Sequence, residues 1–352
     1  MRIALVGTGV QAIPPVGYGG VERTIAEYAA ALAAAGHDPV VLNRVRHGRS
    51  LDEYLFALSV SGLVRSAEAD VVHASTPVVA NRLAVSKIPF VYTSHSRHWF
   101  ERSGARERFG YWLERRAVAR ARMTVALTPS LRTEILRVVP SARDRIAVIP
   151  IGVDTDRFRP DPTARSGRVA LGVGIVRPIK RWELAASAAV AAGWSFRLAG
   201  PTPDPGYADR LRSLGPSVEL LGELTDDELR REFGRADVLL HPSRVELLAG
   251  AVLQGLSAGL PVVGAEPVAT LIDNGETGWT SPPGSDAPAI RAFFADRLRD
   301  LSDAGVRARM GAAARAVAES RYSWPSVVAA HLAVYGRAFG DGGGRGGTPT
   351  PH

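Results

Sequence analysis

Short apolar runs alternate along the first half of the chain with longer stretches in helical spacing. The opening run at residues 2–6 ends at Gly7, and an Ala-rich helical pattern follows at about residues 21–35. Further apolar runs come at residues 39–42, 69–73, 89–93 and 123–127. Strands that alternate with helices at this spacing indicate βαβ units, so the pattern predicts a parallel sheet.

The same alternation starts again after Arg159-Pro160-Asp161-Pro162, a stiff polar stretch typical of a linker. A helical pattern lies at residues 181–192. Apolar runs lie at residues 168–175, 195–199, 218–221, 238–240 and 261–263. The predicted fold class is therefore α/β, with two Rossmann-like, doubly wound domains.

The position of the linker sets the expected domain boundaries. We expect the first domain at residues 1–160 and the second at residues 161–325. A C-terminal helix at residues 326–339 is expected to cross back to the first domain. Residues 340–352 are rich in glycine and end in Thr and Pro, so we expect a disordered tail there.

Composition excludes several classes of protein. The chain has 352 residues, of which 46% are hydrophobic and 22% charged, as is ordinary for a globular protein. The absence of cysteine excludes disulfide scaffolds, thiolate metal sites and cysteine nucleophiles. The sequence offers neither a signal peptide nor an apolar window long enough to span a membrane, so we expect a cytoplasmic protein.

The formal net charge is +8, and only Lys87 and Lys180 among the cationic residues are lysines. A basic excess favours anionic partners such as nucleotides, phosphates or membrane surfaces. No nucleic-acid-binding motif accompanies the charge, so a nucleic-acid partner is not expected.

Gly7-Thr8-Gly9 follows the first strand and imitates a dinucleotide-binding fingerprint. Pro14-Pro15, however, falls where the helix should begin. The second strand ends at Asn43-Arg44, without the carboxylate that would bind a ribose. A structural turn is therefore favoured, and an NAD(P)-dependent oxidoreductase remains as the less favoured alternative.

A second glycine cluster, residues 17–23, directly precedes the first helical pattern. Glycines such as Gly19 and Gly20 let backbone N–H groups approach an anion, and the helix dipole favours negative charge there. Glu22, in the first turn, suits a helix cap or a contact in a substrate cleft. A flexible loop that merely begins a helix explains the glycines equally well.

The second half of the chain holds the candidate anion site. A strand ends at Gly174, and Arg177 and Lys180 follow just before a helix, where cations suit a diphosphate. A later strand delivers His241-Pro242-Ser243-Arg244-Val245-Glu246. Glu246 and Gln254 are two helical turns apart, so they can share one helix face, one meeting a sugar and the other a ribose.

These motifs, in this order, resemble the retaining nucleotide-sugar glycosyltransferases of family four, which have the two-Rossmann GT-B fold. The resemblance runs from Met1 to about Gly340. It is carried by residues 17–23, 149–158, 180, 241–263 and 274–278. It implies a hexosyltransferase-type enzyme that moves a sugar from a nucleotide-diphosphate donor to an acceptor hydroxyl with retention of anomeric configuration.

The resemblance also implies roles for particular residues. Arg177 or Lys180 would neutralise the diphosphate, and Glu246 would contact the donor sugar. His95 would face the sugar from the first domain, with His98 as the alternative. The expected catalytic residues are therefore His95, Lys180 and Glu246, and the expected donor-binding residues are Gly19, Gly20, Arg177, Lys180, Glu246 and Gln254. Glu22 and His98 are assigned to the acceptor or cleft.

Three positions depart from the family pattern. Gln254 stands where the family has its second glutamate, and Ile175 stands where it has an arginine after Gly174. Ala249 stands where a glycine is usual, although Gly250 lies next to it. An amide can still accept a hydrogen bond from a ribose hydroxyl, but without the assistance of a charge. A catalytically degenerate protein that binds a nucleotide sugar is therefore kept as an alternative.

Asp154-Thr155-Asp156 imitates the Asp-x-Asp pair that holds a divalent cation in metal-dependent glycosyltransferases. In the resembled family this segment is a landmark of a metal-free fold, so we expect neither a metal nor another cofactor. Lysine, arginine and helix dipoles can do the work of the cation.

Residues 97–122 contain eight arginines interleaved with five aromatic residues. We favour a solvated helix whose aromatic residues face the core. The alternative is a membrane-facing surface, in which arginines meet lipid headgroups and aromatic rings settle at the interface. Under that alternative we expect peripheral contact with the inner membrane surface. The acceptor is expected to be a glycan, a lipid-linked molecule or a small-molecule hydroxyl.

Overall fold

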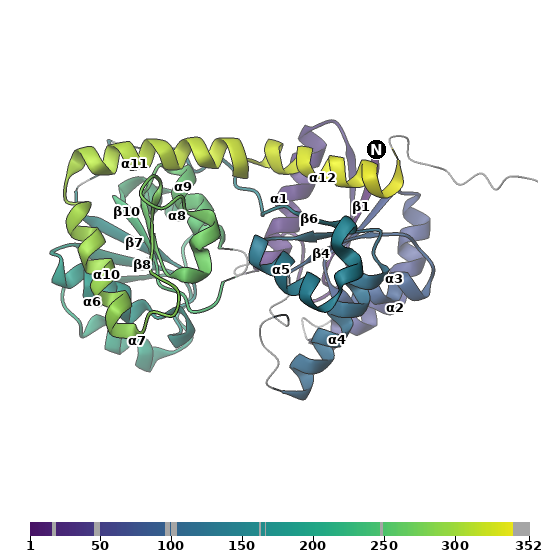
Figure 1. Cartoon of the computed structure of the whole chain (residues 1–352), viewed down its shortest axis with the longest axis horizontal. Helices are drawn as coiled ribbons and strands as arrows, with labels where there is room; N and C mark the ends of the chain where they lie inside the picture. Colours follow the sequence, from purple (N-terminus) through teal and green to yellow (C-terminus); the bar gives the residue numbers. More distant parts are fainter. Residues whose placement is uncertain are drawn as a thin grey trace, which may run out of the picture. The chain divides into compact units, whose positions relative to one another are not determined.

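The computed structural model describes residues 1–15, 19–45, 50–95, 99, 104–161, 163–165, 167–246 and 249–340. The chain divides into two units (Figure 1). Unit 1 comprises Met1–Gly152 and the C-terminal segment that begins at Trp324, and unit 2 is Val153–Ser323. The expected tail lies outside the described residues, apart from Gly340.

The division at Gly152 comes earlier in the chain than the predicted boundary at residue 160. The segment that follows Gly152 packs within unit 2, because the Val153 N–H donates to the carbonyl of Tyr322 at 2.8 Å. The buried ring of Phe158 lies edge-on to Phe233, with ring centroids 5.4 Å apart. Arg315 also donates to the carbonyl oxygens of Thr155 and Phe158.

Unit 1 is built on a parallel sheet with the strand order β2-β1-β3-β4-β5-β6. Its strands are β1 Arg2–Val6, β2 Asp38–Leu42, β3 Val71–Ala74, β4 Val91–Ser94, β5 Met123–Ala126 and β6 Ile146–Val148. Its helices are α1 Gly20–Ala34, α2 Ser50–Ala67, α3 Pro77–Val85, α4 Ala105–Arg120, α5 Pro129–Val138, a 3₁₀ turn Pro140–Arg145, and α12 Trp324–Phe339. Every residue of β3, β4 and β5 is buried, as expected of a parallel sheet covered on both faces.

Helix α12 completes the core of unit 1 although it comes from the far end of the sequence (Figure 1). Its apolar face includes Val327, Val328 and Tyr335, which join the core cluster around Leu5 and Val91. The Tyr335 hydroxyl lies 2.6 Å from Nδ1 of buried His73 and 2.9 Å from the hydroxyl of Tyr28.

Unit 2 repeats this architecture with the strand order β12-β11-β10-β7-β8-β9. Its strands are β7 Val169–Val173, β8 Ser195–Ala199, β9 Val218–Gly222, β10 Val238–His241, β11 Val262–Gly264 and β12 Gly278–Thr280. Its helices are α6 Trp182–Ala191, α7 Pro205–Arg212, α8 Asp226–Arg235, α9 Gly250–Ser257, α10 Ala287–Asp300 and α11 Ala304–Val317. Its shorter helical segments are the 3₁₀ turns Pro178–Lys180 and Glu266–Leu271 and a π-helical turn Ala318–Tyr322.

The two sheets confirm the predicted fold class of two doubly wound α/β halves. In each sheet the first strand in the chain lies between strands that extend the sheet in opposite directions, β1 beside β3 and β7 beside β10. The carboxyl ends of such a strand pair form the crevice in which doubly wound sheets bind ligands. These two crevices, one in each unit, are therefore the first places to look for a site.

Candidate functional site

In unit 2, loops from β7 and β10 bring a lysine and a glutamate together at the carboxyl ends of these neighbouring strands. Lys180 Nζ lies 2.6 Å from Glu246 Oε2, and both side chains are mostly buried, at 15% and 13% exposure. His241, the last residue of β10, places its Nε2 3.0 Å from the same oxygen. The Ala249 N–H donates to the other oxygen at 3.3 Å.

The surroundings of Glu246 keep it ionised. Burial by itself raises the pKa of Glu246, but the hydrogen bond and charge of His241, and after them Lys180, outweigh burial and hold that pKa well below its usual range. Since its Oε2 meets two donors, Glu246 is a carboxylate at any ordinary pH.

Arg181 joins the β7 loop to the β10 loop. Its Nε donates to the Pro242 carbonyl at 2.8 Å and its Nη2 to the Ser243 carbonyl at 3.2 Å. Burial, and then the charge of Arg244, lower the pKa of Arg181. Arg177 and Arg244 are both exposed. The loops after β7 and β10 therefore carry four cationic residues, of which Lys180 contacts Glu246.

The helices that follow these loops begin without a side-chain cap. Arg181 precedes α6 with φ at 53°, and Ala249 precedes α9 with φ at 39°, a left-handed conformation that is costly for residues other than glycine. Elsewhere in unit 2, Asp204, Thr225 and Asp286 cap their helices with a side-chain oxygen. Neither helix start has a side-chain cap, and the N–H groups of Leu184 and Val252 donate to the carbonyls of Arg181 and Ala249 at 3.0 and 2.8 Å. The N-terminal end of a helix dipole favours an anion.

Gln254, on α9, is half-buried, and its side chain forms no hydrogen bond with any residue that the structure describes. The structure thus brings Lys180 and Glu246 into contact, and Gln254 lies on α9, the helix that follows Glu246. Arg177 is exposed in the loop after β7. His241 and Arg181 are further polar contacts that the sequence analysis did not assign.

Unit 1 has a pocket of about 430 Å³ at the carboxyl ends of its central strands. Thr8 follows β1, Ser75 and Thr76 follow β3, and His95 follows β4. The other lining residues that the structure describes are Val21, Glu53, Tyr54, Pro77, Val78, Arg106, Phe109, Gly110 and Leu113. Burial raises the pKa of Glu53, against the lowering effects of a hydrogen bond to Thr76 and the charge of Arg106.

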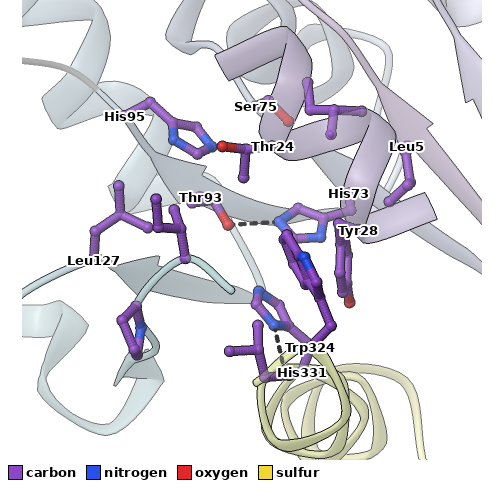
Figure 2. Close-up of a pocket in the computed structure, with 14 residues that line it drawn as sticks. Leu5, Thr24, Tyr28, His73, Ser75, Thr93, His95, Leu127, Trp324 and His331 are labelled. Carbon is purple, nitrogen blue, oxygen red and sulfur yellow. Dashed lines mark hydrogen bonds between the residues drawn. The ribbon is translucent and has the colours of Figure 1, made fainter. Parts of the chain in front are cut away.

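His95 lies between this pocket and a smaller cavity of about 40 Å³, shown in Figure 2. Burial, and then the nearby His331, lower the pKa of His95 to about 4, so its imidazole is neutral at pH 7. Its Nδ1 is buried and has no hydrogen-bond partner among the described residues. An imidazole nitrogen between two cavities is suited to exchange a hydrogen bond with a ligand hydroxyl.

Gly19 and Gly20 lie at the start of α1, as predicted. Gly19 is buried, and a methyl group there would meet the side chains of Gln11 and Pro15. Gly20 is exposed. Glu22 is buried and accepts a hydrogen bond from the Thr8 hydroxyl at 2.7 Å, which ties α1 to the loop after β1. His98 lies outside the described residues.

Gly7-Thr8-Gly9, which imitated a dinucleotide-binding fingerprint, and Asp154-Thr155-Asp156, which imitated a metal-binding pair, both lie in loops closed by hydrogen bonds within their own unit. The Gly9 N–H donates to Oδ1 of Asn43, so this loop is closed by the neighbouring strand end. Asp154 Oδ1 accepts from the N–H groups of Asp156 and Arg157 at 3.1 and 2.9 Å. The described residues contain no group of three His, Asp or Glu side chains arranged to hold a metal ion. Nor do they contain a helix long and apolar enough to cross a membrane.

Both halves of the chain match families of glycosyltransferases. Residues 18–157 match the model described as Glycosyltransferase Family 4, and residues 173–301 match Glycosyl transferases group 1. Among the relatives is an alpha-maltose-1-phosphate synthase of Mycobacterium tuberculosis, 28% identical over 76% of this chain and 79% of the relative. Another is a glycogen synthase of the same organism, 27% identical over 95% and 94%.

Solved structures show the same architecture. A sucrose-phosphate synthase from Thermosynechococcus elongatus superposes with a TM-score of 0.80 at 17% identity, over 96% of this chain and 99% of that one. The Anabaena protein HepE, in complex with UDP and glucose, superposes with a TM-score of 0.71 at 20% identity, over 95% and 98%.

The fold is thus that of a GT-B glycosyltransferase, and the predicted resemblance is confirmed. The chain belongs to glycosyltransferase family four, whose members move a sugar from a nucleotide-sugar donor with retention of configuration.

Proposed function

We propose that the crevice of unit 2 binds the diphosphate of the donor and that the pocket of unit 1 takes the acceptor. The observation that carries this assignment is the meeting of Lys180 and Glu246 at the ends of β7 and β10, beside two helix starts without side-chain caps. Cations and free N–H groups stabilise a diphosphate, and a buried carboxylate suits sugar hydroxyls.

In the transfer step the bond between the anomeric carbon and the diphosphate breaks, and the leaving group gains negative charge. Lys180 and Arg177, with the N-termini of α6 and α9, would stabilise that charge more in the transition state than in the bound donor. These groups need no metal ion, so we expect a metal-independent reaction. The diphosphate oxygen would take the proton of the attacking acceptor hydroxyl on the same face, which retains the configuration.

The other predicted residues receive supporting roles. Glu246 would contact the donor sugar, Gln254 the ribose, and His95 a sugar hydroxyl through its unpaired Nδ1. The start of α1 at Gly19 and Gly20 would lie toward the donor phosphates. Glu22 and His98 stay assigned to the acceptor or cleft, and we propose that the protein works in the cytoplasm, in peripheral contact with the inner membrane.

Thermal stabilisation by a panel of nucleoside diphosphates and their sugars tests this function, because a ligand that binds the folded state raises its stability. The best-stabilising nucleotide sugar should then be consumed in a transfer assay, with the anomeric configuration of the product read by NMR. An inverted product, or no stabilisation by any nucleoside diphosphate, would contradict the proposal.

A further inference from the structure

Helix α4 presents two large aromatic side chains to solvent. Phe109 and Trp112 are 47% and 46% exposed, and their rings stack with centroids 5.8 Å apart at 19°. Leu113, Ala117 and Val118 of the same helix are buried in unit 1. The aromatic pair is therefore not needed for the core, although its exposure to water is unfavourable.

Arginines surround this pair. The exposed cations of α4 are Arg106, Arg108, Arg115, Arg116 and Arg120. None of them forms an ion pair with another described residue, and the guanidinium of Arg116 lies 4.7 Å from the Trp112 ring centroid. Aromatic rings flanked by unpaired arginines suit the boundary between anionic lipid headgroups and acyl chains.

The α4 surface is continuous with the pocket of unit 1. Arg106 and Phe109 line that pocket and also belong to the exposed face of α4. A molecule whose polar head entered the pocket would therefore carry any apolar portion out over Phe109 and toward Trp112.

We propose that α4 docks on an anionic lipid bilayer and that the acceptor is an amphiphile, with its polar head in the pocket and its apolar part in the bilayer. The identity of the acceptor rests on the proposed function, whereas docking on lipid does not. The exposed face of α4 has the positive charge and the aromatic residues that an anionic lipid surface would bind. Because α4 belongs to unit 1, unit 1 rather than unit 2 would contact the membrane.

Co-sedimentation of the full chain with vesicles tests the docking. Binding to equimolar phosphatidylglycerol and phosphatidylcholine should exceed binding to phosphatidylcholine alone at least about tenfold and fall steeply with salt. The emission of Trp112 should shift to the blue, since the other five tryptophans are buried or half-buried. Arg108→Glu/Arg116→Glu should abolish binding.

The matched control is Arg291→Glu/Arg309→Glu, which reverses two exposed arginines of unit 2 and should leave vesicle binding unchanged. Equal binding to both vesicle types, an equal loss in the control, or salt-sensitive self-association in place of lipid binding would overturn the proposal. UDP titration of each variant separates failure of lipid docking from failure of the proposed function. The proposed function places donor binding in unit 2, so a variant of α4 that no longer binds vesicles should still bind UDP.

A separate observation concerns His241, which is 2% exposed. Its Nε2 shares Glu246 Oε2 with Lys180, while its Nδ1 has no partner in the described part of the chain. Trp182 packs edge-on against the ring, with centroids 6.4 Å apart. The histidine is thus fixed in the core, and among the described residues its ring nitrogens bond to Glu246 alone.

A diphosphate that attracts Lys180 would draw it from Glu246 and leave a buried carboxylate short of a donor. We infer that His241 is a positioning residue that, with the Ala249 N–H, holds Glu246 in place while Lys180 engages the donor. Taking a charged donor away from a mostly buried carboxylate is costly, so the hydrogen bond from His241 to the same oxygen has a defined task.

His241→Gln and His241→Asn test this role as a matched pair. The longer glutamine can place an N–H at the Nε2 position and should keep turnover within about threefold, whereas asparagine should lose about tenfold in kcat with less change in the KM for donor. Equal kcat in the two variants would overturn the role. The role would also be overturned if His241→Asn and His241→Gln lost the same amount of kcat and thermal melting showed that the loss comes wholly from unfolding.

Discussion

At the scale of the residue, Lys180 is the side chain on which the proposed chemistry depends most. Lys180→Ala should lower turnover about 100-fold, the effect of losing one donor to a developing oxyanion. Lys87→Ala, which removes the only other lysine and lies in unit 1, should leave turnover unchanged. Steady-state transfer from a nucleotide sugar measures both, and unaltered turnover in Lys180→Ala would remove Lys180 from the mechanism.

Gln254 offers a gain-of-function test. Gln254→Glu should tighten UDP binding about tenfold, because a carboxylate accepts a stronger, charge-assisted hydrogen bond from the ribose. Calorimetric titration with UDP measures the change, and weaker binding would show that Gln254 does not face the ribose. If only the variant transferred sugar, the degenerate alternative would be favoured.

The sequence identified Lys180 and Glu246 because each closely follows an apolar run, and strand ends meet at one edge of a parallel sheet. His241 escaped assignment because it closes the apolar run of β10, where periodicity predicts only burial. Arg181 escaped because its left-handed conformation and its bonds to Pro242 and Ser243 arise from the packing of two loops. Neither the contact of His241 with Glu246 nor the loop packing of Arg181 can be read from a single sequence.

At the scale of the element, most strands were predicted because each coincides with a run of apolar residues. β6 and β12 have three residues each, Ile-Ala-Val and Gly-Trp-Thr, and were missed because so short a run carries no period. β11 is equally short, but the Gly-Leu-Pro that precedes it marked a new strand. For the aromatic segment the sequence left two alternatives, a membrane-facing surface and a solvated helix with its aromatic residues in the core. Trp99 is buried, whereas Phe109 and Trp112 of α4 are exposed, so only part of the segment enters the core, and membrane contact stays a prediction.

The docking of α12 on unit 1 should be sensitive to acid. Burial lowers the pKa of His331 to about 4. The His331 ring packs against His73, Tyr28 and Tyr335, and its charge would also disfavour the protonation of His95. Between about pH 6.5 and 4 the unfolded chain binds protons that the folded chain does not, so stability should fall as pH falls through this range. Thermal melting against pH measures the slope.

His331→Asn removes this titration and keeps an N–H for the Val327 carbonyl, so the pH dependence should become shallower. A slope that His331→Asn does not alter would show that other groups set the acid sensitivity.

At the scale of the whole molecule, the chain closes unit 1 only with its last helix. A chain that ends at Ser323 lacks Trp324, Val327 and Tyr335 from the unit 1 core, whereas unit 2 is a continuous segment with its own sheet. Hydrogen exchange should therefore show lost protection in β1–β5 and native protection in β7–β11. Ending the chain at Gly340 should change neither, and retained protection throughout unit 1 after truncation at Ser323 would contradict this dependence.

The central claim is that unit 2 binds a nucleoside diphosphate through Lys180. Calorimetric titration of the full chain with UDP, with NADH as the comparison, tests it most directly. We predict one UDP site, weakened at least about tenfold in Lys180→Ala but not in Lys87→Ala, and no comparable binding of NADH. Tight binding of NADH without UDP, or UDP binding that Lys180→Ala leaves unchanged, would contradict the claim.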